Sequence, residues 1–132
     1  MAPSARILAS LITRKDIWGT LLLLLLAVVS LLAWTPAERQ VSLSDWDKAN
    51  HLAAFGALAC VAMLWRGHRP GAWRAVALAL LAYGGLIELV QMGIPSRSAD
   101  WADVLADALG IAMGLGLGRS LLLLPAWATA SR

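Results

Sequence analysis

Residues 17–34 read IWGTLLLLLLAVVSLLAW, a run without a charged side chain. As a helix rising 1.5 Å per residue, this run would span roughly 27 Å, close to the hydrocarbon thickness of a bilayer. Three more apolar segments follow at residues 47–65, 73–92 and 103–124. Backbone groups in lipid must be satisfied within their own segment, and these segments lack the period of two that is typical of barrel strands. The sequence therefore predicts an all-α integral membrane protein, a four-helix bundle.

The composition agrees with this fold class. Of the 132 residues, 60% are hydrophobic and 14% are charged, whereas soluble domains average about 25% charged residues. Four spans use nearly the whole chain, so we expect one membrane domain over residues 1–132 and no separate soluble catalytic domain. The single Cys60 excludes an intramolecular disulfide, and the absence of a Lys/Arg block argues against a nucleic-acid partner. A cleaved signal peptide is the alternative for residues 17–34, but the apolar run exceeds the usual length and no A-x-A site follows it.

The tryptophans and turn residues mark the ends of the predicted spans. All seven tryptophans lie near such an end, where indole rings sit at headgroup level: Trp18, Trp34, Trp46, Trp65, Trp73, Trp101 and Trp127. The second and third connections are short and contain Gly67, Pro70-Gly71 and Gly93-Ile94-Pro95. Short connections predict antiparallel neighbouring spans.

The distribution of basic residues predicts the orientation. Eight of the eleven lie at the chain ends or in the second connection: Arg6, Arg14, Lys15, Arg66, Arg69, Arg74, Arg119 and Arg132. The first and third connections with their flanks hold three basic residues against seven acidic ones. The positive-inside rule then puts both termini in the cytoplasm and turns the first and third connections outward.

The polar and ionisable residues of the outward side are candidates for a site, because polar and charged groups within or bordering spans are costly. They come from the start of the second span, the end of the third and the start of the fourth: Asp47, Lys48, His51, Glu88, Gln91, Arg97, Asp100, Asp103 and Asp107. His51 and Glu88 are the catalytic candidates, as an acid/base or orienting pair. Lys48 and Arg97 would bind a phosphate or carboxylate, and the remaining residues would complete the binding site.

Two further features of this cluster bear on ligands. Asp103 and Asp107 with Asp47 or Glu88 could gather a hard divalent cation through oxygen atoms, although no cofactor is required by the pattern. No nucleophilic Ser or Cys lies beside the histidine in sequence, so covalent catalysis has little support.

Several of these residues also have a purely structural interpretation. Asp47 and Asp100 fit helix capping, with acidic residues favoured in the first turn. Lys48 and Arg97 could snorkel to headgroups, and a lone histidine is more often packed in a core than used as a ligand. Glu88 is the hardest to explain in this way, because it lies a full turn inside the helix end, where an unpaired charge is expensive.

A glycine stripe runs along the fourth span. Gly110, Gly114 and Gly118 repeat every four residues, a pattern that lets helices approach closely in lipid. Asp103 and Asp107 share this stripe, so we expect them to point into the bundle, with Gly84 in the third span as their neighbour. The same glycines could instead serve a partner membrane protein or a second copy of the chain.

Three blocks together resemble the VanZ-like family of small bacterial membrane proteins, whose founding member is linked to teicoplanin resistance. They are DKANHLAAFGALA, GLIELVQ and RSADWADVLADALGIAMG, which cover roughly residues 47–114. The resemblance implies a multi-pass protein of the bacterial cytoplasmic membrane with an envelope-related function. One position departs from the family pattern, since Asp107 stands where Asn is common, which adds a negative charge.

These patterns are compatible with three functions. The first is an outward-facing site for an envelope component such as a lipid-linked sugar, a phospholipid headgroup or a peptidoglycan precursor, with membrane lipids as surroundings. The second is a non-catalytic module whose polar cluster only holds the helices together while a partner binds elsewhere. The third, ion conduction, ranks last because the inner halves of the spans supply only Arg119. The pattern is compatible with an enzyme without requiring one.

Overall fold

The computed structural model of the protein describes residues 10, 12, 14–36, 47–94 and 100–130, with all their side chains except those of Asp47 and residues 125–130. Within these ranges the chain forms four helices and no strand: α2 (Lys15–Trp34), α3 (Asp47–Arg66), α4 (Ala72–Gln91) and α5 (Trp101–Ala130). Each contains a stretch long and apolar enough to cross a membrane. The predicted all-α fold with four candidate spans is confirmed.

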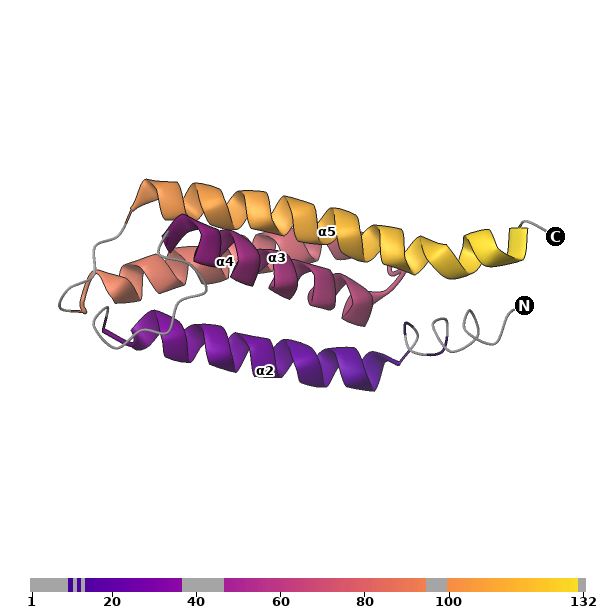
Figure 1. Ribbon diagram of the computed structural model, residues 1–132, viewed down its shortest axis with the longest axis horizontal. Helices are drawn as coiled ribbons and strands as arrows, with labels where there is room; N and C mark the ends of the chain where they lie inside the picture. The colour runs from indigo at the N-terminus through magenta and orange to yellow at the C-terminus, as the bar shows by residue number, and fades with distance from the viewer. Residues whose placement is uncertain (1–9, 11, 13, 37–46, 95–99, 131–132) are drawn as a thin grey trace.

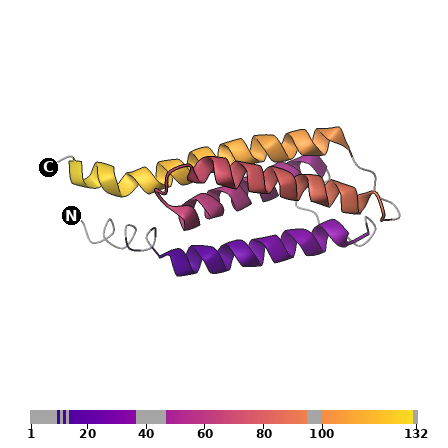
Figure 2. The same ribbon diagram turned by 180° about the vertical axis from the view of Figure 1, so that it is seen from behind.

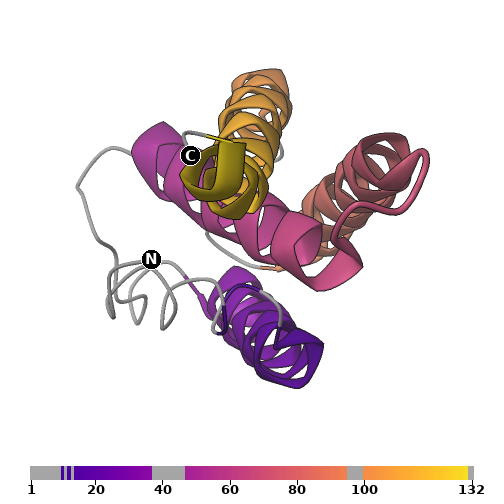
Figure 3. The same ribbon diagram turned by 90° about the vertical axis from the view of Figure 1, so that its right-hand side faces the viewer.

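The helices run alternately up and down the bundle, so the start of α2 and the end of α5 lie at the same end (Figures 1 and 2). Seen along its length in Figure 3, the bundle has α3 in the middle, with α5, α4 and α2 arranged around it. We call the end where α3 and α5 begin and α4 finishes the acidic end. The opposite end, where α3 finishes and α4 begins, is the basic end.

The closest packing in the bundle joins α3 to α5 through glycines. A side chain at Gly110 or Gly114 would collide with backbone oxygens of Leu52 or Gly56, and one at Gly118 would come within 2.7 Å of Met63 Cβ. The glycine stripe is thus covered by α3 of the same chain. The backbone of α3 occupies the space that their missing side chains leave, and an external partner at these glycines stays a prediction.

Helix α2 packs against the core through apolar side chains such as Leu22 and Leu26, and polar contacts join it to α4. The hydroxyls of Ser30 and Tyr83 lie 2.8 Å apart, and the Tyr83 hydroxyl also donates to the Leu26 carbonyl at 3.3 Å. Large apolar side chains such as Leu23 and Leu31, 69% and 65% exposed, point away from the bundle. An outward apolar face of this kind is what a lipid-facing helix presents.

Both bounds of α5 differ from the predicted ones, while the bounds of α2, α3 and α4 lie within two residues of their predicted positions. Helix α5 begins at Trp101 instead of residue 103, because the Asp100 carboxylate accepts a hydrogen bond from the Ala102 N–H at 2.9 Å and so caps the helix. It ends at Ala130 instead of residue 124, since Pro125 removes one backbone donor without ending the helix. The tight turn between α3 and α4 relies on Gly67 and Gly71, whose φ angles of 64° and 70° favour glycine.

Candidate functional site at the acidic end

Three helices bring ionisable side chains together at the acidic end. His51 lies one turn into α3, Glu88 lies in the last turn of α4, and Asp103 and Asp107 lie in the first two turns of α5. The side chain of His51 is 11% exposed, and the three acidic residues are at least nine-tenths buried. The prediction that these residues lie close together in the bundle holds for this group.

His51 and Asp107 form the deepest contact of the group. The Nδ1 atom of His51 lies 2.9 Å from Oδ1 of Asp107, whose side chain is 2% exposed. The other carboxylate oxygen, Oδ2, lies against Gly84 of α4, where a Cβ atom would come within 2.6 Å of it. Asp107 therefore fills a space between α3 and α4, as the sequence predicted from Gly84.

Lys48 and Asp100 lie toward solvent above this contact. The Lys48 Nζ atom is 2.9 Å from Asp100 Oδ2 and 3.6 Å from Asp103 Oδ1, the second being an ion pair too long for a hydrogen bond. The Asp100 N–H donates to Glu88 Oε2 at 3.2 Å. These contacts connect the beginnings of α3 and α5 to the end of α4.

Asp100 combines the capping role and the site role that the sequence left open. The Ala102 N–H and then the Lys48 ammonium group lower the pKa of the Asp100 carboxyl below its ordinary value, because both interactions favour the charged form. Asp100 therefore carries a negative charge next to Lys48 at neutral pH. The ion pair is half exposed, so it remains open to exchange with an anion from outside.

Three buried carboxylate oxygens of the cluster accept no hydrogen bond: Glu88 Oε1, Asp103 Oδ1 and Asp107 Oδ2. A buried polar atom without a partner costs about 1–3 kcal/mol, and a charged one costs more. His51, Glu88 and Asp103 each offer a potential metal-ligating atom, and these three atoms lie within 4.8 Å of one another. The cluster is thus compact, electron-rich and incompletely satisfied.

Three predicted site residues are not brought into this cluster. Gln91 is buried but turns to α2, where its Nε2 donates to the Ala33 carbonyl at 3.4 Å. Arg97 and the side chain of Asp47 fall outside the described part of the chain. Their predicted binding roles stay predictions.

Two aromatic residues that the sequence analysis did not single out support the site. Phe55 lies one turn after His51 and is 1% exposed. Its ring would be 3.3 Å from a Cβ at Gly84, so it lies beside the space that Asp107 fills between α3 and α4. Its ring lies 5.9 Å from that of Tyr83. The i, i+4 spacing of His51 and Phe55 was a usable signal for a shared face.

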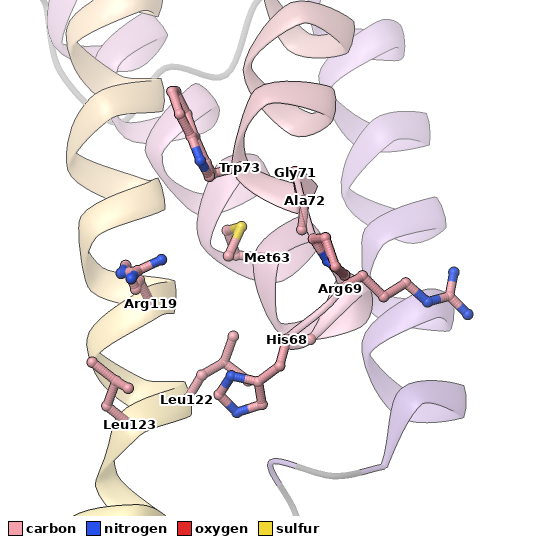
Figure 4. Close-up of a pocket in the computed structure, with 11 residues that line it drawn as sticks. Met63, His68, Arg69, Gly71, Ala72, Trp73, Arg119, Leu122 and Leu123 are labelled. Carbon is pink, nitrogen blue, oxygen red and sulfur yellow. The ribbon is translucent and has the colours of Figure 1, made fainter.

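The basic end has a different character. A cavity of about 330 Å³ lies between the α3–α4 turn and α5. In Figure 4 the His68 ring lies near Leu122, while the Arg69 side chain extends away from Arg119. These polar side chains are exposed, so they resemble the headgroup-level basic residues of a membrane face more than an organised centre.

Comparison with protein families identifies the chain. A family model described as VanZ/LLP1 matches residues 5–123, and the protein therefore belongs to this family. The resemblance drawn from the three sequence blocks is confirmed. No curated protein and no solved structure matched the chain.

Proposed function

We propose that the acidic end is an outward-facing site that binds the polar headgroup of a cell-envelope component. The candidate components are a lipid-linked sugar, a phospholipid headgroup and a peptidoglycan precursor. Membership of the VanZ/LLP1 family supports an envelope context, and the excess of basic residues at the opposite end supports the outward orientation. Resistance to an envelope-targeting antibiotic would follow where such a component is the drug's target.

The observation that carries the proposal is the set of buried carboxylate oxygens on Glu88, Asp103 and Asp107 that accept no hydrogen bond. A polar network that serves stability alone is favourable when all its members are satisfied, and a partly satisfied network is worse than an apolar core. The cluster therefore stores unfavourable free energy that a bound group would relieve. Storage of this kind is typical of functional sites.

The other side chains divide the binding task. Lys48 is the cation at the mouth, and its half-exposed partner Asp100 can give way to a phosphate or carboxylate. Below it, Glu88 and His51 would orient a hydroxyl group or exchange a proton with it, with Asp107 fixing the His51 ring through Nδ1. The proposal needs no covalent intermediate.

The binding step can be tested with lipid probes in phosphatidylcholine nanodiscs that contain the full chain. Native mass spectrometry would compare retention of a polyprenyl phosphate and of phosphatidylglycerol. We expect Lys48→Gln and Glu88→Gln to weaken retention of at least one probe by about tenfold, the loss expected for a hydrogen bond to a charged group. Arg69→Gln at the basic end is the matched control and should retain the wild-type affinity. Equal retention by all four proteins would refute the proposal.

A structural network is the second candidate function, because the same contacts join three helices. The His51–Asp107, Glu88–Asp100 and Lys48–Asp100 contacts all connect different helices or their flanks. If the network only holds the bundle together, His51→Ala and Glu88→Gln should unfold the protein. If the acidic end is a binding site, at least Glu88→Gln should stay folded and lose an envelope phenotype such as glycopeptide tolerance.

A further inference from the structure

We propose that the acidic end binds one divalent transition-metal ion between His51 of α3, Glu88 of α4 and Asp103 of α5. One donor atom from each residue lies within 4.8 Å of the other two. In a tetrahedral zinc site with bonds of about 2.0–2.1 Å the donors are roughly 3.4 Å apart, so small side-chain rotations suffice. The ion's role toward a headgroup rests on the proposed function, whereas its binding rests on these side chains alone.

The ring of His51 is already oriented for a metal. Asp107 holds Nδ1 at 2.9 Å, so the proposed ion would bind through the other ring nitrogen, Nε2. Metal-binding histidines nearly always donate their second ring N–H to a carboxylate, a carbonyl or water, which fixes the tautomer and raises the basicity of the ligand. Asp107 is itself fixed, because it is 2% exposed and lies against Gly84. Asp107 would therefore orient the His51 ring without binding the ion itself.

The two acidic ligands present unused oxygens from the other two helices. Glu88 Oε1 and Asp103 Oδ1 are buried and accept no hydrogen bond, while each residue is at least nine-tenths buried. The second oxygen of Glu88, Oε2, is fixed by the Asp100 N–H at 3.2 Å. A metal ion would bind Glu88 Oε1 and would give Asp103 Oδ1 a closer partner than the Lys48 ammonium group at 3.6 Å.

The excess of acidic groups in the cluster also favours binding of a divalent cation. Among the described residues, four carboxylates (Glu88, Asp100, Asp103 and Asp107) lie together with one ammonium group, that of Lys48. Even when His51 is protonated, the described carboxyl groups of the cluster outnumber its described cations by four to two. Buried like charges at this spacing repel one another strongly unless a cation lies between them.

The donor set identifies the class of metal. One imidazole nitrogen and two carboxylates suit Zn²⁺, Fe²⁺ or Mn²⁺ better than Ca²⁺ or Mg²⁺, which prefer oxygen ligands only. The all-oxygen set expected from the sequence, with Asp103 and Asp107 as its core, changes because Asp107 is turned toward His51. Three protein ligands also leave a fourth position for water or for an anionic oxygen of a headgroup.

Metal binding can be measured directly on the full chain in detergent, purified without a polyhistidine tag and stripped with a chelator. Co²⁺ is the probe, followed by its visible absorption and then displaced by Zn²⁺. We expect one Co²⁺ per chain and a weakening of at least about tenfold in Glu88→Gln and in Asp103→Asn. Asp107→Asn should weaken binding by about 10- to 100-fold through the orientation of His51. Asp16→Asn, the same change at an exposed carboxylate of the basic end, should bind as the wild type does.

The proposal fails if the wild-type chain binds no Co²⁺ at millimolar concentration. It also fails if the Glu88→Gln and Asp103→Asn variants, with wild-type helical circular dichroism, bind Co²⁺ as tightly as the wild type. Should one variant fail to fold, the other decides, and Zn²⁺ must still raise the melting temperature of the wild type. Co²⁺ binding without retention of either lipid probe would refute the proposed function and leave the metal site standing. Retention with no Co²⁺ binding would refute the metal site alone.

Discussion

The two ends of the bundle use charged residues in opposite ways. At the acidic end, Glu88, Asp103 and Asp107 are at least nine-tenths buried, and three of their oxygens accept no hydrogen bond. At the basic end, His68, Arg69 and Arg119 are exposed around a cavity of about 330 Å³. Exposed charges at headgroup level are inexpensive and orient a membrane protein, whereas buried charges are retained at the expense of stability. The difference separates a face that positions the protein from a face with candidate chemistry.

The largest contrast concerns the side of the membrane on which each end lies. In a Cys60→Ala background, Trp101→Cys at the acidic end should react with a membrane-impermeant maleimide in intact cells, because Trp101 is 85% exposed there. His68→Cys at the basic end should react only after lysis. The labelled fraction is measured from the mass that the maleimide adds to the protein. The reverse pattern would place the acidic end in the cytoplasm and remove the outward site.

The two histidines of the chain offer a matched test of stability. His51→Ala leaves Asp107 buried without its partner, so we expect a loss of about 3 kcal/mol in unfolding free energy. His68→Ala removes an exposed side chain and should change stability by less than about 0.5 kcal/mol. Denaturant unfolding in mild detergent, followed by circular dichroism, measures both. The double variant His51→Leu with Asp107→Leu should recover most of the loss, since it removes the stranded charge. Equal effects of the two alanine variants would contradict the contrast between the ends.

The glycines of α5 provide the smallest contrast. Gly110→Ala, near the acidic end, and Gly118→Ala, nearer the basic end, should each destabilise by about 1–3 kcal/mol through overpacking against α3. Only Gly110→Ala should also weaken Co²⁺ binding, because Gly110 lies one turn from Asp107 and the substitution would push this part of α5 away from α3. Gly116→Ala, whose Cβ would meet nothing within 4 Å, is the control for both measurements. Identical Co²⁺ affinities in the Gly110 and Gly118 variants would show that the acidic end does not depend on this contact.

The fold was largely predictable because one physical rule governs it. Lipid requires about 20 apolar residues per crossing and satisfied backbone groups, so four apolar segments become four helices with nearly the expected bounds. Capping by Asp100 was also visible as a candidate in the sequence, although not the two-residue shift in the start of α5 that it produces.

The candidate site was predictable only in part of its membership, since Gln91 turns to α2. Spacing places His51 with Phe55 and Asp103 with Asp107 on single helix faces, and antiparallel order puts these faces at one end. Spacing within one helix says nothing about how that helix is rotated against its neighbours. The glycine stripe therefore indicated close packing, but the sequence offered the third span or another chain as its neighbour, whereas the structure places α3 there.

By itself, then, the sequence determined a four-span α-helical membrane protein of VanZ-like pattern whose acidic and basic residues separate to opposite ends. Only the tertiary structure decided that Asp107 pairs with His51, that Gln91 turns to α2 and that Glu88 and Asp103 share one small volume with His51. The physical reason is that hydrophobicity and helical periodicity are properties of one segment. Contacts between helices depend on their rotation and separation, which the packing of small residues against a neighbouring backbone sets.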